Sequence, residues 1–254
     1  MVRNRGNNME YIRRVIDNQI NERNQAFNAI NIVGPKGCGK TRTAKERCET
    51  VIEFQDEEKR AGYLAVANSS PTLFLKNKKP ILFDEWQDAP TIWGTIRKDC
   101  DDHPDAVGEY YLTSSTSQKI KTVHTGTGRI GEIIMYPMTL FETGESNGSI
   151  SLFQLFNDPK YNSDGEKTDI KLDDLFFAAA RGGWPRCLAL KNSQAKLEIA
   201  RDYYHQIYHK DMSAIDGVQR NEEWARTLNM GICQKFRNLC KKDKNIYRCQ
   251  SNPR

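Results

Sequence analysis

The sequence predicts an α/β protein with a mostly parallel sheet and flanking helices, followed by a helical region. Short apolar runs rich in β-branched residues alternate with stretches of helical periodicity along the first half of the chain. A glycine-rich loop, GPKGCGKT at residues 34–41, stands between one such run and one such stretch. After Phe141 only helical periodicity continues. Strands that alternate with helices pair in parallel through crossover helices, which gives the predicted fold class.

The expected elements follow from these two periodicities. The expected strands are short apolar runs: 26–33, 80–84, 109–113 and 130–136. The expected helices carry apolar residues at helical spacing: 10–21, 40–54, 90–96, 151–156, 172–181 and 185 to about 210. The glycine loop therefore lies between a strand and a helix, which is the context that a phosphate-binding loop requires.

Composition bounds the class of protein. The chain has 254 residues, of which 38% are hydrophobic and 28% charged, as in globular rather than disordered proteins. A net charge of +5 permits an anionic ligand and does not by itself indicate nucleic acid. No apolar run is long enough for a membrane helix, and the start of the chain is not a secretory signal. The 7 cysteines are scattered without a C-x-x-C pair, so we expect reduced thiols and a cytoplasmic location.

The loop fits the pattern G-x-x-x-x-G-K-[ST], which binds nucleoside triphosphates. Glycines allow positive φ and close approach, so that successive N–H groups can point at the β-phosphate. Lys40 can reach the β- and γ-phosphates, and the Thr41 hydroxyl can bind Mg²⁺. The alternative is a glycine-rich turn that merely precedes a helix. The candidate nucleotide-binding residues of the loop are Gly34, Pro35, Lys36, Gly37, Cys38, Gly39, Lys40, Thr41 and Arg42.

Two carboxylates end the apolar run PILFDE at residues 80–85. Ligands of open parallel sheets sit at the carboxyl ends of the strands, so Asp84 is expected beside the glycine loop, where it would orient Mg²⁺ or its water. Glu85 could then polarise a water for attack on the γ-phosphate. The alternative is an ordinary pair of acidic residues at a strand end.

Further candidates follow the later strands. Thr113 and the two serines after it can touch the γ-phosphate or the attacking water, unless they form a plain serine-rich turn. Arg129 ends the loop HTGTGR and could stabilise charge on a transferring phosphoryl group, in cis or from a neighbouring subunit. An exposed loop arginine is the alternative. Trp86 and Trp93 are expected to be core or interface anchors rather than base-stacking residues.

Several motifs together resemble a known family. The stretches are GPKGCGKT, LFDEWQ, LTSS, HTGTGRI, MYPMTLFETGES and RGGWP. They resemble prokaryotic ATP-binding proteins of the AAA+ superfamily, in which an N-terminal ATPase domain precedes a C-terminal domain of uncharacterised function. The resemblance covers residues 11–211. It implies a P-loop ATPase core over 1–145, a helical lid over 146–210 and the start of a C-terminal domain over 211–254.

The resemblance also implies roles for residues that spacing alone does not select. It places Gly183 and Pro185 of the GGWP turn against the adenine, whereas local chemistry alone indicates a plain interhelical turn. It places Arg14 near the base or the phosphates. Ser114 departs from the family, which has glycine there, and would crowd the loop if that position needed positive φ.

The end of the chain is the larger departure from the family. The family continues through a winged-helix-like region, whereas this sequence ends in a basic stretch after Gly231. We expect those residues to be a poorly ordered terminus produced by truncation or a reading-frame change. The alternative is a basic tail that binds nucleic acid.

The resulting functional hypothesis is Mg²⁺-dependent ATP binding with slow hydrolysis. One alternative is an ATP-gated switch with negligible hydrolysis, and another is an inactive truncated product. A small-molecule kinase would need a second substrate pocket, and no arginine-rich lid segment suggests one. The expected partners are ATP and an unknown protein client. Nucleic acid could bind only through the missing C-terminal region, no membrane is expected, and oligomers are compatible with the family.

Overall fold

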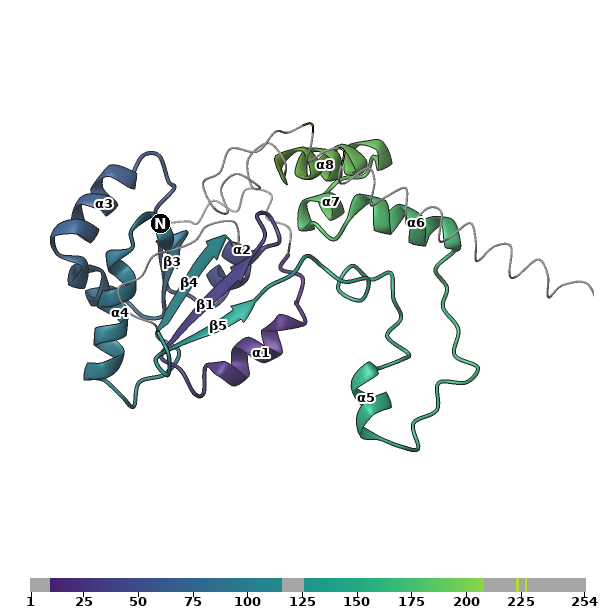
Figure 1. The fold of residues 1–254 in the computed structure, drawn as a ribbon, viewed down its shortest axis with the longest axis horizontal. Coiled ribbons are helices and arrows are strands. Elements are labelled where there is room, and N and C mark those ends of the chain that lie inside the picture. The colour runs from purple at the N-terminus through teal and green to yellow at the C-terminus, as the bar shows by residue number, and fades with distance from the viewer. Residues whose placement is uncertain (1–9, 116–125, 208–222, 224–226, 228–254) are drawn as a thin grey trace, which may run out of the picture. The chain divides into compact units, whose positions relative to one another are not determined.

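The computed structural model describes residues 10–115, 126–207, 223 and 227. The chain divides into two compact units, residues 1–200 and 201–254. The first contains a 5-stranded parallel sheet with the order β2-β3-β4-β1-β5 (Figure 1). The strands are β1 (Ala29–Gly34), β2 (Thr50–Glu53), β3 (Ile81–Asp84), β4 (Tyr110–Ser115) and β5 (Ile130–Ile134). The predicted α/β class with a parallel sheet is therefore confirmed.

Helices connect and flank the strands. The α-helices of the sheet region are α1 (Ile16–Arg23), α2 (Lys40–Lys45), α3 (Arg60–Ser69) and α4 (Thr91–Asp102). Two 3₁₀ helices are η1 (Pro71–Lys76) and η2 (Trp86–Asp88). The helical region that follows contains α5 (Leu152–Asn157), α6 (Leu172–Arg181), α7 (Pro185–Ala189) and α8 (Ser193–Gln206). None of the helices in these ranges is long and apolar enough to cross a membrane.

Each face of the sheet has its own apolar core, because successive strand residues point to opposite faces. Ile30 and Ile32 of β1 pack on one face with Ile20 of α1 and Ala44 of α2. The other face is covered by α3, η1 and α4. Its core members are mainly aromatic or branched: Ala29, Ile52, Phe54, Phe74, Ile81, Phe83, Ile92, Ile96 and Leu112. The sheet is thus held between two layers of helices, as Figure 1 shows.

The predicted helix over 40–54 is wrong in its second half. Helix α2 ends at Lys45, and residues 50–53 form β2, which pairs with β3 from Thr50↔Ile81 to Glu53↔Asp84. Val51 and Ile52 fit either period, and a short apolar run does not distinguish a helix from a strand. Residues 50–53 form a strand because they hydrogen-bond with the free edge of β3.

Two further helices differ from expectation in extent. Helix α1 begins at Ile16, and residues 10–14 are not helical, although a helix was expected from residue 10. The single helix expected from residue 185 is two helices, because Leu190 after α7 has extended backbone at φ −91° and ψ 140°. Both differences lie beside the cavity described below.

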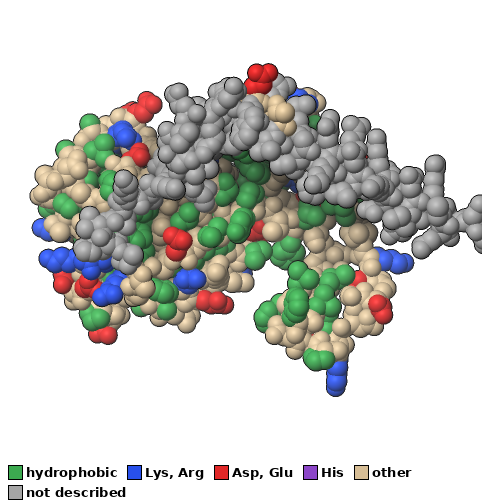
Figure 2. Space-filling view, viewed as in Figure 1, with side chains coloured by type: hydrophobic (Ala, Val, Ile, Leu, Met, Phe, Trp, Pro, Cys, Tyr) green, Lys and Arg blue, Asp and Glu red, His purple; other side chains and the backbone are tan. Residues whose placement is uncertain are grey.

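Helix α5 carries an exposed apolar surface (Figure 2). Phe153 and Phe156 are 77% and 87% exposed, and Leu152 is 72% exposed. No residue of α5 is buried.

The strand order brings the site together. Strand β4 lies between β1 and β3, and all three run in the same direction. The register pairs Gly34 with Ser115 and Phe83 with Leu112. The glycine loop, Asp84 and the end of β4 consequently share one edge of the sheet, which is the expected place for a ligand site.

Candidate functional site

The glycine loop has the backbone that its sequence requires. Gly37 and Gly39 have φ of 71° and 110°, in the region that favours glycine. Gly34 does not have positive φ but allows a close approach, since a Cβ there would lie 2.2 Å from the carbonyl oxygen of Met135. Gly39 is followed directly by α2. Exposed N–H groups at a helix start favour an anion, so the loop can hold phosphate.

Lys40 is buried inside the loop. Its side chain donates hydrogen bonds to the carbonyl oxygens of Gly34 and Pro35 at 2.9 and 3.2 Å. Lys40 is only 4% exposed. Because its ammonium is held by neutral carbonyl groups, it can move to an anionic phosphate, which is a stronger acceptor.

Asp84 joins the loop to the end of β4. One carboxylate oxygen, Oδ1, accepts hydrogen bonds from the Thr41 hydroxyl at 2.7 Å and from the Thr113 hydroxyl at 2.6 Å. Thr113 in turn accepts from the backbone N–H of Glu85 at 3.0 Å. The predicted meeting of Thr41, Asp84 and Thr113 at one edge is found in the structure. Thr113 acts here as a hydrogen-bond bridge between the two acidic residues.

The residues at this edge fit Mg²⁺. Thr41 and Asp84 offer a hydroxyl and a carboxylate oxygen, the hard donors that Mg²⁺ prefers. The described residues contain no cluster of three or more histidine, cysteine or acidic side chains suited to a metal. Mg²⁺ is usually held by one or two protein oxygens together with phosphates and water, so this donor set suits it.

Glu85 has an unusual backbone conformation. Within the described part of the chain it is the only non-glycine residue with positive φ, at 53°. Its carboxylate accepts hydrogen bonds from the side-chain amide of Gln87 and from the Ser115 hydroxyl, the latter at 3.3 and 3.4 Å. Left-handed backbone at a non-glycine residue is strained and is concentrated at functional sites. The carboxylate therefore lies at the site edge in a defined orientation.

A cavity of about 380 Å³ adjoins the start of α2. One wall is the segment before α1 with Tyr11, Ile12 and Arg14, and another is Gly39, Arg42 and Thr43. Glu10, Met138, Pro185 and Ala189 complete the lining. Its size and mixture of apolar and polar groups suit a small aromatic ligand. The structure therefore places Arg14 and Pro185 at one cavity beside the loop.

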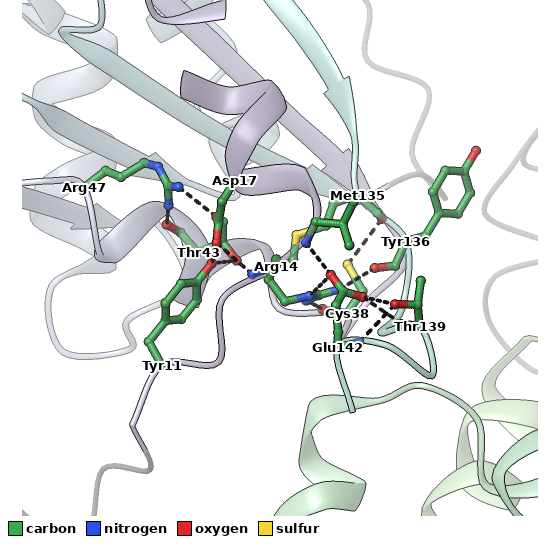
Figure 3. Close-up of polar contacts among 11 residues, drawn as sticks. Tyr11, Arg14, Asp17, Cys38, Thr43, Arg47, Met135, Tyr136, Thr139 and Glu142 are labelled. Atoms are coloured by element: carbon green, nitrogen blue, oxygen red, sulfur yellow. Dashed lines mark hydrogen bonds and ion pairs between the residues drawn. The ribbon is translucent and has the colours of Figure 1, made fainter. Parts of the chain in front are cut away.

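Arg14 connects three segments at this cavity (Figure 3). Its guanidinium donates to the carbonyl oxygens of Cys38 and Tyr136, both at 2.8 Å, and to Glu142 Oε1 at 2.9 Å. The C=O and N–H of one peptide unit point in opposite directions. By holding the Cys38 carbonyl, Arg14 directs the following N–H, that of Gly39, away from itself.

Tyr11 is fixed beside the cavity by a second group of polar contacts (Figure 3). Its hydroxyl donates to Asp17 at 2.9 Å and lies 3.2 Å from the Thr43 hydroxyl. Arg47 donates to the same Asp17 oxygen at 2.7 Å. Burial raises the pKa of the Tyr11 hydroxyl, and the neighbouring Asp17 charge raises it further. Tyr11 therefore stays protonated and can donate.

Gly183 holds the turn before α7 against the segment after β5. Its carbonyl oxygen accepts from the Met138 N–H at 2.7 Å. A Cβ at residue 183 would lie 2.1 Å from the Met138 carbonyl oxygen, so only glycine fits. This contact explains how the turn brings Pro185 to the cavity.

The remaining loop residues contribute less to the site. Lys36 is exposed. Arg42 pairs with Glu46 at 2.7 Å and lies over the Tyr11 ring. Cys38 is fully buried, and burial raises the pKa of its thiol.

Ser114 does not crowd the loop. It lies within β4, is 1% exposed and has no positive φ. The expected penalty for replacing glycine is therefore absent.

Arg129 is not near the phosphate-binding edge of its own chain. It precedes β5, whose first residue, Ile130, pairs with Ala29 at the opposite end of β1 from Gly34. The separation along the strand is roughly 16 Å at about 3.3 Å per residue. Its side chain pairs instead with Asp101 at 2.7 Å. The structure does not bring Arg129 to the glycine loop of its own chain, and its role in hydrolysis, in cis or in trans, stays a prediction.

Comparison with protein families agrees with this geometry. Residues 26–144 match the family described as an AAA domain. The protein has an N-terminal AAA domain. Residues 172–241 match a domain of unknown function (DUF8612), so the resemblance to AAA proteins with an uncharacterised second domain is confirmed. The second match begins at α6, within the expected lid, and extends past Gly231 into residues that lie outside the described ranges.

Comparison with individual proteins adds less. The Walker-type ATPase PABY2304 of Pyrococcus abyssi is similar in structure at 13% identity, with a TM-score of 0.38, over 91% of this chain and 77% of that chain. No curated protein matches the chain. The AAA domain and its glycine loop together support a P-loop ATP-binding protein.

Sequence reasoning did not select Tyr11 and Met138, which line the cavity, or Glu142, which holds Arg14. Met138 and Glu142 belong to the stretch MYPMTLFETGES that carries the resemblance. That stretch held the only signal for them. Trp86 and Trp93 were correctly expected to be anchors, since they stack at 4.7 Å between ring centroids in the core.

Proposed function

We propose that the AAA domain binds ATP with Mg²⁺ and hydrolyses it slowly. The observation that carries the proposal is the Asp84 carboxylate shared by the Thr41 and Thr113 hydroxyls at the mouth of the glycine loop. In this proposal the loop holds the phosphates and the adjoining cavity takes the adenine. Arg14 and Pro185 line that cavity, which supports the roles that the resemblance implied for them. Gly183 does not line it and contributes by anchoring the turn to Met138.

The chemistry would use residues already in place. Mg²⁺, when bound, neutralises charge on the β- and γ-phosphates. Lys40 exchanges its loop carbonyl acceptors for phosphate oxygens. Glu85 accepts a proton from a water whose oxygen bonds to the γ-phosphorus, while the bond from that phosphorus to the bridging oxygen breaks and its electrons leave with ADP.

A second candidate is an ATP-gated switch with negligible turnover. The hydrogen bonds from Gln87 and Ser115 to the Glu85 carboxylate favour the switch, because they occupy the group that must receive the proton.

A cytoplasmic location, an unknown protein client and an oligomeric assembly stay predictions from the sequence.

Calorimetry and phosphate release separate these functions. We expect Lys40→Ala to abolish tight ATP binding, because it removes the mobile cation of the loop. Glu85→Gln should keep ATP affinity and lower phosphate release by about 10²-fold or more, since an amide cannot accept the proton. Glu132→Gln, at an exposed position of β5, is the matched control. An unchanged ATP affinity in Lys40→Ala would refute the glycine loop as the binding site. Negligible phosphate release by the wild type would support the ATP-gated switch instead of the ATPase.

A further inference from the structure

The loop after β5, residues 139–146, is built around two glutamates. Thr139 donates to Glu142 Oε2 through its backbone N–H at 2.7 Å and its hydroxyl at 3.0 Å. The Glu142 N–H is in turn 3.2 Å from the Thr139 hydroxyl oxygen, which is the reciprocal pattern of a capping box. The Thr143 hydroxyl donates to Glu145 at 2.5 Å. The loop therefore orients both carboxylates before either contacts another segment.

Glu142 holds the N-terminal wall of the cavity. Its Oε1 accepts from Arg14 Nε at 2.9 Å and from the Val15 N–H at 2.7 Å. The side chains of Arg14 and Glu142 are 5% and 4% exposed, so the ion pair is buried. Both oxygens of Glu142 are engaged, one toward Thr139 and one toward the wall.

Glu145 holds the segment that leads to Pro185 in the cavity wall. It pairs with Arg181, the last residue of α6, whose side chain is 3% exposed. Arg181 also donates to the Gly182 carbonyl at 3.0 Å, at the start of the turn that brings Pro185 to the cavity. The Met138 N–H secures the next residue, Gly183.

We propose that Glu142 and Glu145 are positioning residues that fix the two walls of the nucleotide-base cavity and thereby set the affinity for ATP. The proposal rests on the proposed function, since it assigns the cavity to the base. One turn carries both carboxylates. Glu142 binds Arg14, which lines the cavity, and Glu145 binds Arg181, which holds the start of the turn that carries Pro185. Neutralising either carboxylate loosens one wall. In Glu142→Gln the Arg14 guanidinium keeps its hydrogen bonds to the Cys38 and Tyr136 carbonyl oxygens, so the glycine loop keeps its phosphate-binding groups.

Glutamine is the appropriate substitution. It is close in size to glutamate but replaces one acceptor oxygen with an NH₂ group that faces a donor. At Glu142 this group must face either Thr139 or the Arg14 side. At Glu145 it faces Arg181 in either orientation, because Arg181 donates to both carboxylate oxygens. Loss of one charged hydrogen bond in each wall predicts ATP and ADP affinities about tenfold weaker.

The experiment measures affinities for ATP, ADP and inorganic tripolyphosphate by calorimetry, and kcat and KM for ATP. In Glu142→Gln and Glu145→Gln we expect weaker ATP and ADP binding and a raised KM. Tripolyphosphate affinity and kcat should stay within about twofold, because neither depends on the base cavity. The exposed Glu132→Gln is the control. Thr139→Ala and Thr143→Ala serve as replacements if the glutamine variants do not fold. Both keep the two ion pairs, and each should weaken ATP binding about threefold.

The outcomes distinguish a failure of the positioning role from a failure of the proposed ATP-binding function. If the wild type binds ATP and the variants bind it equally well, only the positioning role is overturned. An equal loss for tripolyphosphate also overturns it, because the glutamates would then act on the glycine loop. A wild type that binds neither ATP nor tripolyphosphate overturns the proposed function and this inference with it.

Discussion

Asp84→Asn should separate metal binding from folding. The carboxylate uses a single oxygen, Oδ1, for the hydroxyls of Thr41 and Thr113. An asparagine carbonyl oxygen can accept both hydrogen bonds, so the local geometry survives. What the substitution removes is the negative charge, which is the property that Mg²⁺ needs.

The two expected magnitudes differ clearly. Hydrogen bonds to a charged acceptor are stronger than neutral ones by about 1 kcal/mol, but Asp84 is 8% exposed and its charge also carries a desolvation cost. These effects oppose each other, and we expect the free energy of unfolding to change by about 1 kcal/mol or less. That corresponds to a Tm shift of about 2–4 °C or less. Outer-shell carboxylates around metals contribute about 10–100-fold in affinity, or about 1.4–2.8 kcal/mol.

The assay is ATP calorimetry with Mg²⁺ and with EDTA. Asp84→Asn should bind ATP about 10–100-fold more weakly than the wild type with Mg²⁺ present. In EDTA its affinity should not fall, because a carboxylate near the phosphates only repels them without the metal. Asp105→Asn, at an exposed loop position, is the matched control. An equal loss of affinity in both buffers would refute the metal role of Asp84.

Three more predictions concern stability and assembly. Trp86→Phe removes the indole N–H that donates to Asn31 Oδ1 at 3.1 Å and leaves that buried oxygen without its donor. The free energy of unfolding, measured in urea, should fall by about 1–3 kcal/mol, and an unchanged value would contradict this cost. Burial raises the pKa of Glu142, but the backbone N–H groups and Arg14 outweigh it and hold the pKa below its usual value. The stabilisation by the Glu142 carboxylate is therefore present above the unfolded pKa of about 4.3 and is lost as pH falls through the folded pKa. In Glu142→Gln the free energy of unfolding should fall less steeply at acid pH than in the wild type, and an equal slope would refute this. Arg129→Ala should leave ATP affinity unchanged and abolish any dependence of turnover on protein concentration, whereas a loss of affinity would make Arg129 a ground-state contact.

Local pattern was sufficient for the phosphate-binding half of the site. A strand, a glycine loop and a helix follow one another along the chain, so the positions of Gly37, Gly39 and Lys40 depend on near neighbours. Asp84 needed one further rule, that parallel strands end at a common edge. Both inferences used spacing that the sequence contains directly.

Tertiary structure decided the rest, because those features join segments that no periodicity relates. Arg14 and Glu142 meet across 128 positions of sequence, and Glu145 meets Arg181 across 36. Strand β2 exists because β3 had an edge to pair, although its residues also fit a helix. The register of β5 put Arg129 at the far end of the sheet from the glycine loop. The sequence by itself thus determined how phosphate can be held, whereas chain packing determined which walls enclose the cavity that we propose for the base.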